Sequence, residues 1–253
     1  MSSAREVQSR FFPCHFPHIQ GLDYGGESQP AGEVGGDFFD FIPLQRRALF
    51  VSVGDVSGTG YAAAILMAGL QAFLRGLTSE HCPGPASVVQ ELNRIAHDVA
   101  PENFYATLFY ACVDPVRRQL RYVSAGHEPA LLVRKDAARV LRLECTGTVL
   151  GLSSRSTFGL RSIPLEPGDL LIAVTDGITE SVGAEGRELG DSGILEIVRR
   201  DPGARASELA SRIMEAANSR HCDDRTVVVV RYTGAAEQGA FEDRIADLAA
   251  VAA

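Results

Sequence analysis

The sequence of 253 residues predicts an α+β protein in which antiparallel sheets are covered by helices on both sides. Two observations predict this class. Six short apolar segments follow one another between residues 104 and 176 with no helical stretch between them, and such close spacing requires antiparallel pairing. The main stretches of helical periodicity fall in two blocks, 60–100 and 191–220, which flank these segments in the chain. Segregated helices and strands indicate α+β rather than a doubly wound parallel sheet.

The N-terminal part of the chain is expected to be a lead-in segment followed by two strands and two helices. Gly, Pro and His dominate residues 13–32, so residues 1–30 are predicted as a linker with one short helix. The two strands contain β-branched and aromatic residues between turn residues. The first helix is apolar on nearly all sides, which predicts a buried helix, and the second is amphipathic. The expected ranges are 4–12 (helix), 34–44 and 47–56 (strands), and 60–77 and 86–100 (helices).

The rest of the chain is predicted as a run of strands, two helices and a last strand. The last strand, TVVVVRY, is apolar enough to be central in its sheet. One domain is expected over 31–233, followed by a tail, 234–253, with a helical pattern over 241–253. The expected strands are 104–114, 119–127, 129–135, 138–144, 158–166, 169–176 and 226–232, and the expected helices are 191–200 and 206–220.

Composition and charge exclude several classes of function. Acidic residues outnumber basic ones 32 to 24, and Lys135 is the one lysine in the chain. A P-loop, which needs a lysine after its glycines, is therefore excluded. Without a basic patch we expect no nucleic-acid partner. No run of 18 apolar residues and no signal peptide is found, so we expect no membrane association and a cytoplasmic location. Five cysteines without a C-x-x-C pair do not indicate a disulfide framework.

Carboxylates recur where apolar strands begin or end. Asp37 begins a strand, Asp55 and Asp176 each end one, and Asp223 and Asp224 precede the last strand. Burying an unpaired carboxylate costs several kcal/mol, so converging carboxylates need cations. The sequence neighbours of three of these positions are Gly, Thr, Val and Ser rather than basic residues. Oxygen ligands of this kind indicate Mg²⁺ or Mn²⁺.

Other interpretations of these segments remain open. A single Asp at a strand end is often a turn former or a helix N-cap. Gly36, Gly54 and Gly177 each adjoin an Asp, however, as close approach of the backbone to a ligand requires. Residues 58–63 fit a dinucleotide fingerprint, but the second parallel strand that this fold needs is missing after the helix. His127, at a turn between strands, is better explained as a hydrogen-bonded turn residue than as a catalytic base.

Six motifs carry a resemblance to a known family. They occur in the order VGGDFFDF, VGDVSGTGYAAAILMAGLQAFLR, FYATLFYACVDP, LRYVSAGHEPALLV, LLIAVTDGITE and CDDRTVVVVR, over about residues 30–232. This set resembles the bacterial serine phosphatases of the SpoIIE/RsbU type, a branch of the metal-dependent, protein phosphatase 2C-like superfamily. The resemblance implies an αββα sandwich with a two-metal site between the sheets, and it implies that 31–233 is the catalytic domain.

The resemblance also implies roles for six positions and a cofactor. The cofactor is two Mn²⁺ or Mg²⁺ ions, or three, which activate a water for attack on phosphorus. Eukaryotic relatives carry a histidine two positions after the bridging aspartate, whereas this chain has Ser57 there, so we expect a metal-bound water to act as the general acid. The implied residues are Asp37 near the metals, Asp55 as the bridging ligand, Val56 through its carbonyl, Asp176 and Asp223 on the second metal, and Asp224 as an adjacent hydrogen-bonding partner in the metal group.

The resemblance further implies partners. The expected substrate is a phosphoserine or phosphothreonine on a STAS-type anti-sigma factor antagonist or a similar phosphoprotein. A regulatory sensor protein, or a second copy of the chain, is expected to act through residues 1–30. The alternative function is a catalytically weak phosphatase fold that serves as a binding or scaffold module, because a fold does not settle a function.

Overall fold

The computed structural model describes residues 3–44, 47–78, 84–99, 101, 104–135, 139–182, 186–217 and 223–234. These residues form two five-stranded sheets in which every strand pair is antiparallel. In spatial order, sheet A consists of β1 (Leu22–Gln29), β10 (Arg225–Tyr232), β9 (Leu170–Val174), β6 (Ala130–Val133) and β7 (Val140–Leu143). Sheet B consists of β2 (Phe38–Leu44), β3 (Ala48–Val56), β4 (Ala106–Asp114), β5 (Gln119–Ala125) and β8 (Arg161–Pro164).

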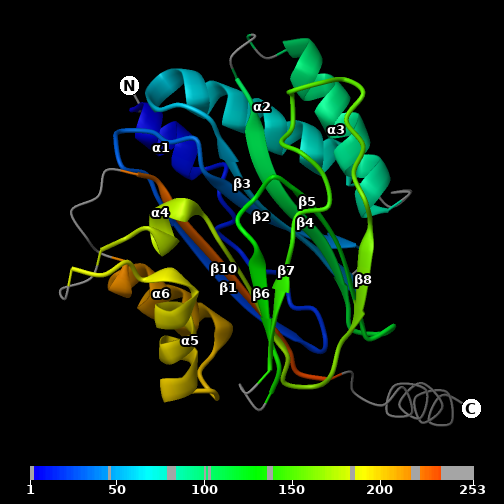
Figure 1. The fold of residues 1–253 in the computed structure, drawn as a ribbon, viewed down its shortest axis with the longest axis vertical. Helices are drawn as coiled ribbons and strands as arrows, with labels where there is room; N and C mark the ends of the chain where they lie inside the picture. The colour runs from blue at the N-terminus through cyan, green and yellow to red at the C-terminus, as the bar shows by residue number, and fades with distance from the viewer. Residues whose placement is uncertain are drawn as a thin grey trace, which may run out of the picture.

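Helices cover the outer face of each sheet, which gives four layers (Figure 1). Sheet B is covered by α2 (Gly60–Leu77) and α3 (Pro85–Val99), whereas sheet A is covered by α5 (Gly190–Arg200) and α6 (Ala206–Ala216). Two shorter helices are α1 (Ala4–Ser9) and α4 (Asp176–Thr179). The predicted αββα sandwich of two antiparallel sheets is confirmed.

The valine run of β10 shows why the layers form. Val228 and Val230 are buried between the two sheets, whereas Val227 and Val229 are buried under α5 and α6. Successive side chains of a strand point to opposite faces, so a strand buried on both faces is apolar at every position. β10 lies between β1 and β9, which confirms the predicted central position of this strand.

One strand was not expected from the sequence. Residues Leu22–Gln29 lie in the expected lead-in segment, yet they pair with β10 along their whole length as β1. Gly25 and Gly26 weaken the strand pattern, because glycine has low strand propensity. The packing requires them: a Cβ at Gly25 would lie 2.6 Å from the Cα of Ser207, and one at Gly26 would lie 2.8 Å from the ring of Phe39. β1 is thus part of the sandwich, while the expected tail helix lies outside the described residues.

The helix α2 differs from the expected fully buried helix. Its inner face packs on sheet B, but Ile65 on the outer face is 72% exposed. The helix has 18 residues with a mean hydropathy of 1.3, so by length and composition it could cross a membrane, although the sequence analysis found no such segment. A helix that covers the core of a sheet passes the same test, so this is weak evidence for a membrane span.

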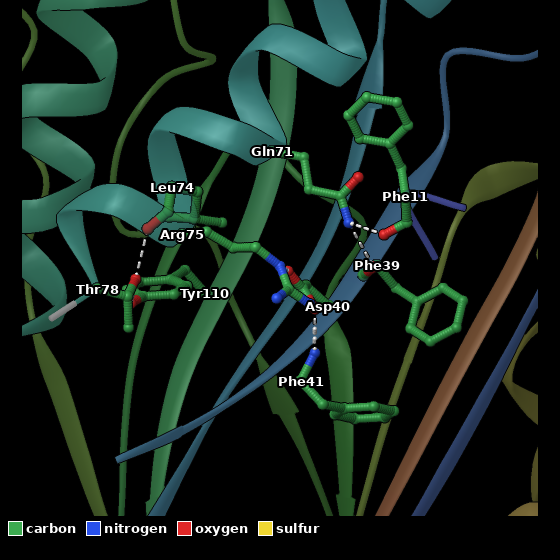
Figure 2. Close-up of polar contacts among 9 residues, drawn as sticks. All are labelled: Phe11, Phe39, Asp40, Phe41, Gln71, Leu74, Arg75, Thr78 and Tyr110. Atoms are coloured by element: carbon green, nitrogen blue, oxygen red, sulfur yellow. Dashed lines mark hydrogen bonds and ion pairs between the residues drawn. The ribbon is translucent and has the colours of Figure 1, made fainter. Parts of the chain in front are cut away.

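Polar contacts fix α2 on sheet B and on the N-terminal segment (Figure 2). The guanidinium of Arg75 donates two hydrogen bonds to the fully buried carboxylate of Asp40 in β2. The amide nitrogen of Gln71 donates to the carbonyl oxygens of Phe11, at 2.9 Å, and Phe39, at 3.2 Å. These bonds set the position of α2 along the sheet and hence the position of its N-terminal end, where the loop from β3 enters.

Candidate metal centre

Five carboxylates meet at one end of the sandwich, between the two sheets. Asp55 is the penultimate residue of β3 in sheet B, and Asp37 immediately precedes β2. Asp176 begins α4 after β9 of sheet A, and Asp223 and Asp224 precede β10. The pKa of Asp55 is raised from its usual value of 3.8 to about 7, first by burial and then by repulsion from Asp176, Asp223 and Asp224. The fold therefore brings together carboxylates that lie up to 187 residues apart in the chain.

Asp37 is the most buried of the five and links the sheets. Its side chain is 3% exposed, and its Oδ2 accepts hydrogen bonds from the hydroxyls of Thr175 and Thr226, both at 2.8 Å. Burial raises the pKa of Asp37 well above its usual range, and repulsion from Asp55 and Asp224 adds to this effect, while the two hydroxyls oppose it. No sequence motif marks the two threonines as site residues, although each stands within two residues of a predicted aspartate.

Asp224 is held by backbone groups of the loop before β2. Its Oδ1 accepts from the amide of Ala31 at 2.8 Å, and its Oδ2 accepts from the amides of Gly36 at 2.6 Å and Asp37 at 3.4 Å. A Cβ at Gly35 would lie 2.2 Å from this carboxylate, so only glycine permits the approach. Both oxygens of Asp224 are thus engaged in hydrogen bonds to backbone amides.

The other three carboxylates are more open. Asp176 is exposed at the surface, and its pKa is raised by desolvation and then by repulsion from Asp223. Its Oδ1 accepts from the amide of Gly177, where a Cβ would lie 2.0 Å from the carbonyl oxygen of Asp224. Asp223 is exposed, and one of its oxygens accepts from the amide of Asp224 at 2.8 Å. Asp55, Asp176 and Asp223 are therefore the carboxylates whose oxygens are most accessible to an ion.

The backbone near Asp55 offers a further oxygen. The amide of Val56 donates to the carbonyl of Gly36 at 3.3 Å, which brings the two segments together. A Cβ at Gly36 would lie 2.6 Å from the carbonyl oxygen of Val56 and 3.5 Å from Oδ1 of Asp55. Glycine at this position thus leaves room around both oxygens, and a side chain there would fill it.

The donor set fits a hard divalent cation. Within the described residues, no lysine or arginine forms an ion pair with any of the five carboxylates. Carboxylate and carbonyl oxygens are the donors that Mg²⁺ and Mn²⁺ prefer, and bound cations would offset the repulsion that raises the pKa values. In the described part of the chain, however, no three His, Cys, Asp or Glu side chains lie close enough together to hold one ion.

A cavity of about 370 Å³ adjoins the carboxylates. It is walled by residues 31–34, by the start of α2 at Thr59–Tyr61, and by Asp223 and Asp224. The hydroxyl of Tyr61 donates to Glu33 at 2.6 Å, which joins two walls of the cavity. A group larger than a phosphate can therefore lie beside the acidic cluster.

Two other predicted features have structural explanations. Ser57 Oγ accepts from the amide of Tyr105 at 3.0 Å, and the Ser57 amide donates to the Tyr105 carbonyl at 2.9 Å, so this side chain helps to attach the loop to β4. Residues 58–63 connect β3 to α2, but β3 pairs antiparallel with both of its neighbours. A dinucleotide fold needs parallel strands here, so the structure does not favour that alternative.

Comparison with known proteins identifies the class and then the family. The PP2C phosphatase domain of SpoIIE from Bacillus subtilis matches with a TM-score of 0.70 at 23% identity, over 84% of this chain and 64% of that one. The RsbU and RsbW domains of Rv1364c from Mycobacterium tuberculosis match with a TM-score of 0.74 at 28% identity, over 87% of this chain and 62% of that one. The sandwich thus has the fold of PP2C-type phosphatase domains.

The sequence comparisons define the family more closely. The model of the family described as stage II sporulation protein E (SpoIIE) matches residues 45–233. Phosphoserine phosphatase RsbU of Bacillus subtilis is 28% identical over 234 residues, which cover 90% of this chain and 68% of that protein. The chain belongs to the SpoIIE family. It spans between 24% and 68% of the length of the curated relatives that it matches.

Proposed function

We propose that this chain is a metal-dependent protein phosphatase that hydrolyses phosphoserine or phosphothreonine on a partner protein. The observation that carries the proposal is the convergence of Asp55, Asp176 and Asp223 at the end of both sheets without a basic partner in the described part of the chain. The names of relatives, such as phosphoserine phosphatase RsbU, support the reaction class.

The proposed cofactor is two Mn²⁺ or Mg²⁺ ions, with a third as a further option. When bound, such ions supply an activated water and stabilise charge on the phosphoryl oxygens. Asp55 and the carbonyl of Val56 would hold the pair of ions from sheet B, and Asp176 and Asp223 would hold one of them from sheet A. Asp37, which is buried next to these ligands, would help to orient them.

The chain's own residues have a second task, which is to hold the acidic loops in place. Asp224 fixes the loop at residues 31–37 by three backbone hydrogen bonds, and the hydroxyls of Thr175 and Thr226 orient Asp37. Fixed donors need little reorganisation when charge develops during the reaction. The 370 Å³ cavity next to Asp223 would accept the residues that flank the phosphorylated side chain.

The proposed substrate is a STAS-type anti-sigma factor antagonist in its phosphorylated form, or a similar phosphoprotein. The likeness to a chain that contains RsbU and RsbW domains supports a partner of this kind. The proposed regulator is a sensor protein or a second copy of the chain that acts through the N-terminal segment. The side chain of Gln8 in α1 supports this idea, because it bonds both the amide and the carbonyl of Gly35, two residues before Asp37.

A second candidate is a binding or scaffold module with weak activity. It is favoured by one observation: in the described residues no three ligating side chains are yet spaced for one ion. Calorimetric titration with Mn²⁺ separates the two functions. Micromolar or tighter binding supports the phosphatase, and no binding supports the scaffold module.

The test of activity is hydrolysis of p-nitrophenyl phosphate, followed by dephosphorylation of candidate phosphorylated STAS proteins. Activity should require Mn²⁺ or Mg²⁺, disappear in EDTA, and fall at least about 100-fold in Asp55→Asn and Asp176→Asn, because each removes a ligand charge. Asp98→Asn is the matched control, since Asp98 is exposed on α3 and pairs with Arg94. Full activity in EDTA, or in Asp55→Asn, would contradict the proposal.

A further inference from the structure

His127 lies on the chain segment that crosses from sheet B to sheet A. It follows β5 of sheet B and precedes β6 of sheet A, and Gly126 before it has a φ of +63°, which favours glycine. The His127 side chain is only 3% exposed. The sequence predicted a hydrogen-bonded turn residue at this position, and the structure shows in addition that the ring is buried, with Nδ1 at hydrogen-bonding distance from another strand.

The ring contacts both sheets beside the carboxylates. On one side, Nδ1 lies 2.8 Å from the hydroxyl of Thr107 in β4, and Thr107 is the direct cross-strand partner of Asp55. On the other side, the backbone carbonyl of Val174 in β9 is close enough to act on the ring. Val174 stands two residues before Asp176. The imidazole thus lies between β4, whose neighbour β3 carries Asp55, and the end of β9, which is followed by Asp176.

The protonation state of the ring follows from its surroundings. Burial lowers the pKa of His127 to about 4, which the Val174 carbonyl opposes, so the ring is neutral near pH 7. A neutral imidazole has one N–H donor and one acceptor nitrogen. Nε2 is buried and has no hydrogen-bond partner of ordinary geometry in the described part of the chain. The arrangement that uses both nitrogens puts the proton on Nε2, toward the Val174 carbonyl, and lets Nδ1 accept from Thr107.

We propose that His127 is a positioning residue that sets the separation of β4 and β9, and so the placement of Asp55 opposite Asp176. The inference rests on the proposed function, in which these carboxylates hold the cations. Much of the contact between the sheets is an apolar cluster that includes Phe109 and Ala173, and apolar contacts have little directionality. A hydrogen-bonded ring can fix the distance between two strands and their relative orientation, as residues that hydrogen-bond to metal ligands do in other sites.

The ring is too deeply buried to touch a substrate, so its role would be exerted through Thr107 and β9 alone. The sulfur of Cys145 donates to the carbonyl oxygen of His127 at 3.2 Å, which helps to hold the crossover segment in place. This arrangement predicts that a change at His127 alters metal affinity more than it alters KM for a small substrate.

The first experiment compares Mn²⁺ binding by calorimetry in the full chain carrying His127→Leu, His127→Asn or Thr107→Val. His127→Leu should bind Mn²⁺ at least tenfold more weakly, and Thr107→Val should bind several-fold more weakly. His127→Asn should recover part of the loss, because its amide can replace Nδ1 next to Thr107. His97→Asn is the control, since His97 is an exposed histidine whose Nδ1 lies 3.0 Å from a backbone carbonyl.

A second measurement does not depend on a variant or on activity. Nitrogen NMR of the imidazole in the metal-free wild-type chain should show a neutral ring with its proton on Nε2. A proton on Nδ1, or wild-type Mn²⁺ affinity and kcat in both His127→Leu and Thr107→Val, would overturn the inference even if the Tm falls. If the wild-type chain itself binds no Mn²⁺, the proposed function fails instead, and the NMR result still reports on the ring.

Discussion

Replacing Asp55 by Asn should make the metal-free protein more stable. The carboxyl of Asp55 is partly buried among like charges, and its pKa is raised from 3.8 to about 7. A carboxyl whose pKa is higher in the folded state than in the unfolded state lowers stability once the pH exceeds the unfolded value, and the loss is complete above the folded value. Asn keeps the size of the side chain and removes the charge.

The size of the effect follows from the shift. One pKa unit corresponds to about 1.4 kcal/mol, so a shift of about three units destabilises the folded state by up to about 4 kcal/mol at pH 8. At pH 5 the carboxyl is largely protonated in the folded state, and the same linkage gives a destabilisation of about 2 kcal/mol. For a domain of this size, 4 kcal/mol corresponds to a rise in Tm of roughly 8–16 °C.

The assay is thermal and chemical unfolding of wild type and Asp55→Asn in EDTA at pH 8 and pH 5. Mn²⁺ at 100 times the Kd should then reduce the difference at pH 8, because it stabilises the wild type by about 2.7 kcal/mol and has little effect on the variant. Asp98→Asn, at the exposed ion pair with Arg94, should change stability by at most about 1 kcal/mol in all conditions.

The reasoning would be refuted if Asp55→Asn were no more stable than the wild type in EDTA at pH 8. It would also be refuted if the gain were the same at pH 5 and pH 8, because the linkage requires the gain to grow with pH between the unfolded and folded pKa values. A gain that depends on pH but is not reduced by Mn²⁺ would support the electrostatic effect and contradict the role of Asp55 as a ligand.

Three further predictions concern the surroundings of the site. Thr226→Val removes one of the two hydroxyls that donate to the buried carboxylate before β2, so denaturant unfolding should show a loss of about 1–3 kcal/mol. Gly177→Ala should lower the Tm and weaken Mn²⁺ binding in calorimetry, because the new Cβ would lie 2.0 Å from the carbonyl oxygen of Asp224. Gly69→Ala in α2 is the control: its Cβ meets nothing within 4 Å, so the free energy of unfolding should rise by about 0.5–1 kcal/mol. Arg75→Met leaves the fully buried carboxylate of Asp40 unpaired and should cost about 3–5 kcal/mol in urea unfolding; a loss under 1 kcal/mol would contradict this ion pair.

Much of the fold was predictable from local patterns. The six closely spaced strands and the two helical blocks lie where their periodicity placed them, because side-chain alternation is a property of each segment alone. The four-valine run of β10 signalled a strand buried on both faces. β1 was missed because Gly25 and Gly26 are there for packing against α6 and Phe39, which no local pattern shows. The outer face of α2 is exposed because only one side of a helix can meet a sheet.

The candidate site also has features that were predictable from the sequence and features that were not. The sequence by itself determined which carboxylates stand next to strand ends and glycines, and it indicated a hard cation as their partner. Only the tertiary structure decided what each carboxylate contacts, because their hydrogen-bond partners lie far away in the chain. Asp224 is occupied by the amides of residues 31–37, whereas Asp55, Asp176 and Asp223 keep more accessible oxygens. The burial of His127 between two strands likewise depends on the packing of both sheets, which segment-by-segment periodicity does not contain.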